Sequence, residues 1–85
     1  MEINEFIQEI DKLMLEEGYI EVSDKNDMIT SLIEECKADN KLYRKALGYL
    51  YSSYSYFEEG DETFFYNSFD SYDSLEEFKR EFGIR

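Results

Sequence analysis

The chain has 85 residues and a formal net charge of −12 at pH 7, with eight tyrosines, seven phenylalanines, one cysteine and no histidine or proline. So negative a charge argues against direct binding to nucleic acid or to an anionic membrane, since both require a cationic surface. A chain of this length buries about 60 to 65 % of the surface that its unfolded form exposes, which is enough for one modest core. We therefore expect a single domain over residues 1–85.

The first predicted element is an amphipathic helix over residues 3–17. Apolar residues recur there at steps of three and four, the spacing that places them on one helical face. Gly18 is a good terminator, because glycine adopts the left-handed conformation without steric cost. Residues 19–22 alternate too briefly to predict a strand by themselves, so we interpret them as an extended connector that can pair with a short later segment.

Two further helices are predicted in the middle of the chain. The second carries its apolar side chains between residues 28 and 36, and Ser23 or Asp24 is the expected N-cap. The third is predicted over residues 41–57, because six apolar or aromatic side chains there span about 100° of the helix circumference. Both helices would present one apolar face to the core.

The last third of the chain combines an ambiguous segment with a clear helix. Residues 63–69 have strand-like propensity, but Phe65 and Phe69 also fit one helical face, and we predict a short helix. Ser74 with Glu77 matches a capping box, so the final helix is predicted to begin at Ser74 and to end at Gly83. These elements together predict an all-α fold: a compact bundle of four to five short helices with a minor extended segment.

The cysteine content and the N-terminus indicate the compartment. Cys36 is the only cysteine, which excludes the disulfide framework of a small secreted protein. The first ten residues carry acids where a signal peptide needs a basic flank. No apolar run approaches the roughly 18 residues of a membrane span. We therefore expect a cytoplasmic protein without contact to a membrane.

The sequence contains no constellation that predicts catalysis. Without histidine there is no triad built on a histidine base and no imidazole metal ligand, and no glycine-rich phosphate loop is present. The residues around Asp24 fail the EF-hand spacing. The acids between residues 61 and 73 are oxygen donors without such a pattern, and they predict at most weak binding of divalent ions. Cys36 lies on an apolar stripe and fits a small buried side chain. We expect no enzyme activity, no cofactor and no metal.

Acidic residues are concentrated at the two ends of the chain. Residues 1–22 and 49–85 each carry a net charge of −6, while residues 23–48 are neutral overall. If the terminal helices pack side by side, these charges would form one negative surface. Glu2, Glu5 and Glu9 rise by about 4.5 and 6 Å along a helix axis, comparable with the roughly 3.4 Å between phosphates of a nucleic-acid strand. The alternative is an ordinary solvated helix face.

Surplus tyrosines point to a protein interface. Tyr49, Tyr56 and Tyr72 cannot all reach the predicted core stripe, and exposed tyrosine is enriched in interfaces. Acidic residues beside these rings would suit an arginine-rich partner, since arginine both pairs with carboxylates and stacks on rings. The alternative is that the rings only cover the edge of a small core. The predicted partner-binding residues are Glu2, Glu5, Glu9, Tyr49, Tyr56, Glu58, Glu59, Asp61, Glu62, Asp70, Tyr72 and Asp73.

The first ten residues, MEINEFIQEI, resemble the opening of small acidic anti-CRISPR inhibitors from phages of low-GC Gram-positive bacteria. Those inhibitors also begin with an amphipathic helix that bears asparagine and acids. The resemblance is limited to these ten residues and to size and charge, and it transfers no functional residue. It implies a phage-encoded protein that acts in the host cytoplasm, although the small β-sheet in the middle of such an inhibitor differs from the helices predicted here for residues 23–57.

These observations predict a protein that acts by binding. The first hypothesis is an inhibitor that imitates nucleic-acid charge and occupies the basic cleft of a host defence nuclease, with a CRISPR effector as the first candidate and a restriction enzyme as the second. An immunity or antitoxin-type protein that neutralises one toxin or enzyme is the alternative. A third possibility is a scaffold that self-associates through exposed rings.

Overall fold

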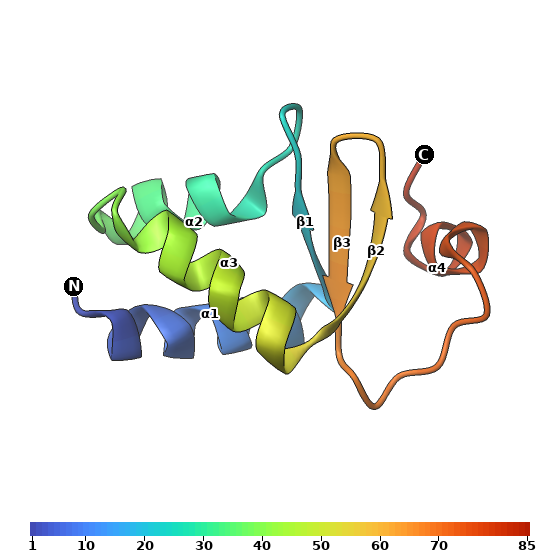
Figure 1. Ribbon diagram of the computed structural model, residues 1–85, viewed down its shortest axis with the longest axis horizontal. Helices are drawn as coiled ribbons and strands as arrows, with labels where there is room; N and C mark the ends of the chain where they lie inside the picture. Colours follow the sequence, from blue (N-terminus) through green and yellow to red (C-terminus); the bar gives the residue numbers. More distant parts are fainter.

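The computed structural model describes residues 1–85 and contains four helices and three strands. In chain order they are α1 (Ile3–Glu17), β1 (Tyr19–Val22), α2 (Met28–Cys36), α3 (Leu42–Ser53), β2 (Ser55–Glu59), β3 (Glu62–Tyr66) and α4 (Leu75–Phe82). The strands form one antiparallel sheet in the order β1-β3-β2 (Figure 1). The fold is therefore α+β, and the prediction of an all-α bundle is wrong.

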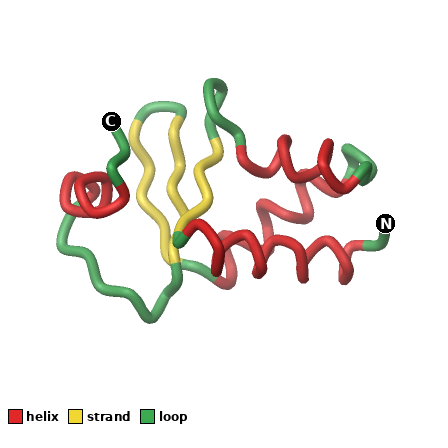
Figure 2. The backbone as a smooth tube through the Cα atoms, turned by 180° about the vertical axis from the view of Figure 1, so that it is seen from behind, coloured by secondary structure: helices red, strands yellow, loops and turns green.

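The sheet separates two hydrophobic clusters. Figures 1 and 2 show α1, α2 and α3 gathered on one side of the strands and α4 on the other. Side chains alternate between the two faces along each strand. Ile20 and Phe65 belong to the larger cluster with α1–α3, whereas Phe64 and Tyr66 join Phe78 of α4 in a smaller one. Both faces of this small sheet are thus covered.

Three of the predicted helix ends are confirmed. Gly18 has φ 83° and its N–H donates to the carbonyl of Met14, which closes α1. The Ser74 hydroxyl accepts a hydrogen bond from the N–H of Glu77 at the start of α4, and Gly83 at its end has φ 69°. The expected cap of α2 was wrong: Asp27, in place of Ser23 or Asp24, accepts from the N–H groups of Ile29 and Thr30, two of the free donors of the first turn.

The third helix is shorter than the sequence predicts. It ends at Ser53, and Tyr54 has the extended conformation φ −127°, ψ 158°. The residues that follow form β2, so Phe57 does not continue the helical stripe. Its ring instead stacks on Tyr66, with centroids 5.2 Å apart, on the sheet face that α4 covers.

The predicted short helix at residues 63–69 is also wrong, because residues 62–66 form the central strand. A two-residue turn, Gly60–Asp61, joins β2 to β3, with Glu59 opposite Glu62. Gly60 has φ 60°, the conformation that glycine supplies at the first position of a type II′ turn. The expected extended segment 19–22 pairs with the other side of β3. No helix has the length and apolar character that spanning a membrane requires.

Candidate functional site

Very little of the negative charge is neutralised within the protein. Of the 21 acidic residues, only Glu59 and Glu62 lie within 4.0 Å of a basic group. Both pair with Lys79 of α4, whose Nζ is 2.8 Å and 3.6 Å from the two carboxylates. The hydrogen bond to Glu59 raises the pKa of Lys79 and keeps this amine charged. Of the other carboxylates, Glu21 is buried, and Asp11 and Asp27 accept hydrogen bonds from tyrosine hydroxyls, whereas most lie exposed at the surface.

The predicted acidic residues lie in three separate places. The acids of the N-terminal half of α1 lie at one end of the molecule, whereas the β2–β3 hairpin and the segment 67–74 lie in the other half of its 36 Å length (Figure 1). Helix α4 lies on the other side of the sheet and approaches α1 only where Gly18, at the end of α1, meets Phe82, so the terminal helices do not pack side by side and their acidic faces do not merge into one surface. The three groups are Glu2, Glu5 and Glu9; Glu58, Glu59, Asp61 and Glu62; and Asp70 and Asp73.

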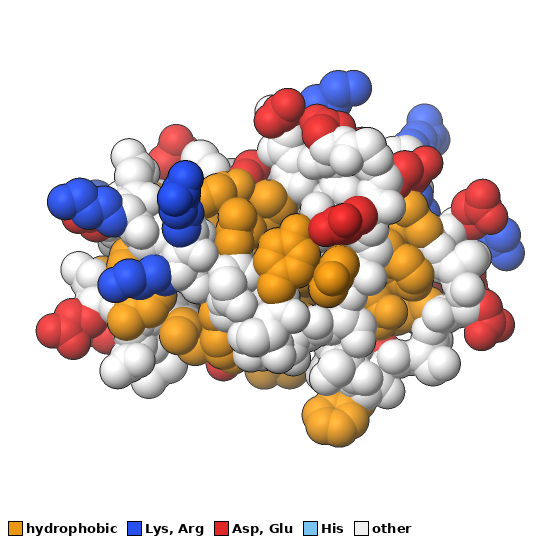
Figure 3. Space-filling view, viewed as in Figure 1, with side chains coloured by type: hydrophobic (Ala, Val, Ile, Leu, Met, Phe, Trp, Pro, Cys, Tyr) orange, Lys and Arg blue, Asp and Glu red, His pale blue; other side chains and the backbone are white.

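Two tyrosines and one glutamate form an exposed aromatic patch where α3 meets β2. Tyr51 and Tyr56 are 42 % and 46 % exposed, and their rings meet edge to face with centroids 4.8 Å apart. Both rings rest on Phe65 of the core, and the Tyr51 hydroxyl donates to Glu58 Oε1 at 3.0 Å. Figure 3 shows hydrophobic side chains exposed in the middle of the molecule, with basic side chains at the helical end and also along the top and the opposite end. We call Tyr51, Tyr56 and Glu58 the tyrosine patch.

The other two predicted interface tyrosines are half-buried. Tyr49 packs against the larger cluster, and Tyr72 packs edge to face against Tyr66 and Phe78 with centroids 5.1 and 5.2 Å apart. Burial raises the pKa of both phenols. Tyr56 is thus the one of the three with a largely open ring, while partner binding by Tyr49 and Tyr72 stays a prediction.

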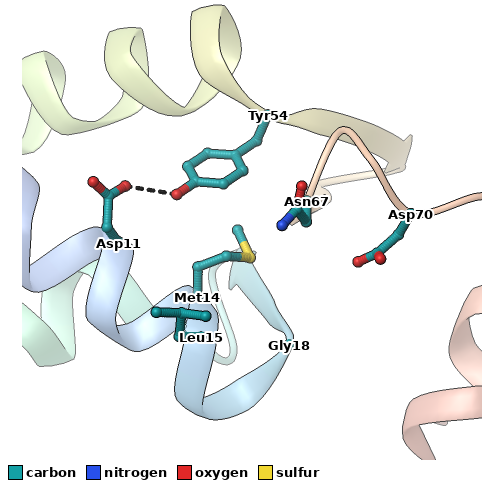
Figure 4. Close-up of a pocket in the computed structure, with 7 residues that line it drawn as sticks. All are labelled: Asp11, Met14, Leu15, Gly18, Tyr54, Asn67 and Asp70. Carbon is teal, nitrogen blue, oxygen red and sulfur yellow. Dashed lines mark hydrogen bonds between the residues drawn. The ribbon is translucent and has the colours of Figure 1, made fainter.

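A cavity of about 330 Å³ opens between the second half of α1, Tyr54 and the segment after β3 (Figure 4). Asp11 Oδ1 accepts hydrogen bonds from the hydroxyls of Tyr49 and Tyr54, each at 2.6 Å. Burial, followed by the bond to Asp11, raises the pKa of Tyr54 well above its usual value. This pair of bonds ties α3 and the start of β2 to α1. The cavity is lined by Asp11, Met14, Leu15, Gly18, Tyr54, Asn67 and Asp70.

Sequence reasoning missed Asp11 and Leu15 at this cavity. In the sequence Asp11 is one of several acids in α1 with nothing to distinguish it, because its two tyrosine partners are 38 and 43 residues away in the chain. Leu15 is 84 % exposed at the rim, and Phe69 of the adjoining segment is 94 % exposed. Only the tertiary arrangement shows that Leu15 lies at a cavity shared by Asp11 and Asp70.

Metal-ligating side chains do not converge anywhere: no group of three or more Cys, Asp or Glu has the arrangement of an ion site. Cys36 is half-buried, and burial raises the pKa of its thiol. No protein family, curated protein or solved structure matches this chain. The function is therefore inferred from the surface of the protein itself.

Proposed function

We propose that the protein is an acidic inhibitor that binds the nucleic-acid-binding cleft of a basic partner protein and excludes its nucleic acid. The observation that supports this most is the near absence of internal ion pairs: a net charge of −12 is carried by a fold in which Lys79 is the only paired cation. Concentrating like charge on a small fold costs stability by self-repulsion. A basic partner would relieve that repulsion on binding.

The exposed groups have the chemistry that such a cleft recognises. Proteins that bind nucleic acid hold phosphates with lysine and arginine, and they stack aromatic side chains or guanidinium groups on the bases. Glu2, which directly precedes α1, and Glu5 in its first turn offer exposed carboxylates in place of phosphates. The tyrosine patch adds two open rings beside a carboxylate, which suits an arginine that pairs and stacks at once. Opposite charges would also accelerate the encounter.

The first targets to test follow from the resemblance of residues 1–10 to anti-CRISPR inhibitors. A CRISPR effector nuclease is the first candidate and a restriction nuclease the second, both in the cytoplasm of the host cell. Inhibition would occur by steric and electrostatic exclusion, with no chemical step on the part of this protein.

The experiment that tests the proposal is a competition assay. The protein is added to a purified effector nuclease bound to fluorescent nucleic acid, and anisotropy is followed at about 0.1 M and about 0.5 M salt. We expect displacement of the nucleic acid at low salt and a large loss of affinity at high salt, because the Debye length falls from about 10 Å to below 5 Å. The variant Tyr56→Ala should displace less.

An immunity-type protein that binds one enzyme beside its active site is the second candidate. The cavity at Asp11 favours it, because a shaped recess with apolar rims suits one complementary partner better than a general charged cleft. A partner that still holds its nucleic acid in the complex, with salt-resistant binding, would identify this class and contradict charge mimicry.

A further inference from the structure

We infer that β2 is a docking edge to which the partner protein adds a β-strand with basic side chains. The inference rests on the proposed function in one respect, the basic character of the partner. It adds the mode of contact: hydrogen bonds between two backbones, which charge mimicry by itself does not require.

The register of the hairpin shows which backbone groups of β2 are free. The pair Glu59–Glu62 closes a two-residue turn, and such a pair exchanges hydrogen bonds. Bonded and non-bonded pairs alternate along an antiparallel ladder, so Phe57 also bonds to β3. Tyr56 and Glu58 therefore direct their N–H and C=O groups away from β3. No other backbone or side-chain group accepts from or donates to them.

The opposite edge of the sheet confirms this alternation and is differently protected. The same alternation of bonded and non-bonded pairs directs the N–H of Glu21 to the outer side of β1, and this N–H donates to Met28 Sδ at 3.1 Å. The first residue of α2 thus covers β1. Figure 1 shows β2 as the other outer strand of the sheet, and its outward N–H groups have no such partner.

Most of the usual devices that block strand addition are absent from β2. Natural edge strands are protected by proline, lysine, bulges or a covering segment. The strand has the sequence Ser-Tyr-Phe-Glu-Glu, its register with β3 is continuous, and the chain contains no proline. Its only charges are Glu58 and Glu59. Glu59 is paired with Lys79, so the unpaired Glu58 is the charge that repels a second copy of this acidic chain and attracts a basic strand.

The side chains around the edge define the strand that would fit. Glu58 and Tyr56 point to the same face of the sheet, where Tyr51 lies against Tyr56. An added strand with arginine on that face would meet one carboxylate and two exposed rings. Opposite charges and aromatic contacts between neighbouring strands are both favourable. The partner segment is therefore an extended stretch with arginine at alternate positions.

The test uses two synthetic peptides of identical sequence, alternating arginine and threonine, one of which has every backbone amide methylated so that neither of its edges can pair. Both carry the same charge, but only the unmodified peptide can form a strand ladder. Amide hydrogen exchange of this protein is measured by NMR with each peptide. We expect the unmodified peptide to slow exchange at Tyr56 and Glu58 at least about tenfold, and the methylated peptide to leave it unchanged. Equal binding of both peptides without protection, or binding of neither, would refute strand addition.

Variants at position 58 separate backbone from charge. Glu58→Pro removes one outward N–H while leaving the bonds to β3 in place, since proline is tolerated on edge strands. We expect this substitution to weaken binding of the unmodified peptide at least about tenfold. Glu58→Gln keeps the N–H and removes the charge, as does the control Glu76→Gln on α4, and each should weaken binding only a few-fold. Should the proline variant not fold, the comparison of the two peptides on the wild-type protein still tests the backbone contact, because the peptides differ only in their amide groups.

The outcomes also distinguish this inference from the proposed function. Displacement of nucleic acid from a nuclease by both wild type and Glu58→Pro would keep charge mimicry and overturn strand addition. Protection of Tyr56 that rises with protein concentration alone would show that a second copy of the chain occupies β2, and would overturn the assignment to a basic partner.

Discussion

Replacing Gly18 with alanine tests how the end of α1 packs against α4. A methyl group added at Gly18 would lie 2.6 Å from Phe82 Cε1 and 3.1 Å from Phe82 Cζ, and the backbone there has φ 83°. The left-handed conformation costs a residue with a Cβ about 1 to 2 kcal/mol. Overpacking typically costs about 1 to 3 kcal/mol more. We therefore expect Gly18→Ala to lower the free energy of unfolding by about 2 to 5 kcal/mol, a large share of the stability of a small domain.

Two other glycines separate these costs in urea denaturation followed by circular dichroism. Gly83 has φ 69° and open space around it, so Gly83→Ala should lose only the conformational part, about 1 to 2 kcal/mol. Gly48 lies inside α3 with no neighbour within 4 Å, and Gly48→Ala should gain about 0.5 to 1 kcal/mol. If Gly18→Ala costs no more than Gly83→Ala, the close contact with Phe82 is refuted.

Three further outcomes are expected. Phe78→Ala should lower the free energy of unfolding by about 3 to 5 kcal/mol, because this fully buried ring joins α4 to the sheet; a loss below about 1 kcal/mol in urea titrations would contradict that role. Burial and the hydrogen bond to Asp27 raise the pKa of Tyr43 to about 12, so the folded state holds this proton more tightly than the unfolded state, and the resulting stability should be lost as pH rises from about 10 to 12. In alkaline unfolding followed by tyrosinate absorbance, Tyr43→Phe should lose less stability over this pH range than the wild type does. An unchanged profile would argue against a contribution from the Tyr43 proton. Added salt from about 0.05 to 0.5 M should raise the Tm, because it screens a net charge that only Lys79 offsets by ion pairing; a lower Tm would count against self-repulsion.

The helices whose signals are local were predictable from the sequence. The extent of α1 follows from its apolar spacing and Gly18, and the start of α4 follows from the capping serine Ser74. These signals depend on residues three or four positions apart, so no distant contact is needed to interpret them.

The sheet was missed because its evidence is distributed along the chain. Leu50, Tyr54 and Phe57 have helical spacing by coincidence, and the chain leaves the helix at Tyr54. The local signal that would have corrected this is Gly60–Asp61, two turn residues between two runs rich in aromatics, which predicts a hairpin. Strand β1 is defined only by its pairing with a segment some 40 residues later, which no local pattern reveals.

The candidate site was predictable in chemistry but not in arrangement. The sequence indicated acids beside tyrosines, and Tyr56 and Glu58 were among the residues predicted to bind a partner. It could not show that Tyr49 and Tyr54 converge on Asp11, since that contact depends on how α3 crosses α1. Nor could it identify an open edge, because an edge exists only once the strand order is known.

The position of β3 between β1 and β2 constrains the route by which the chain folds. The β2–β3 hairpin closes across two residues, whereas Val22 must find Thr63 across a loop of some 40 residues before β1 can join. Hairpins form in about 1 to 10 μs, and long-range pairing is slower because loop-closure entropy is lost first. The hairpin is thus the template on which β1 arrives last. Substitutions in β1 should accordingly speed unfolding more than they slow folding, and transient opening of the native protein should begin by release of the N-terminal segment from the sheet.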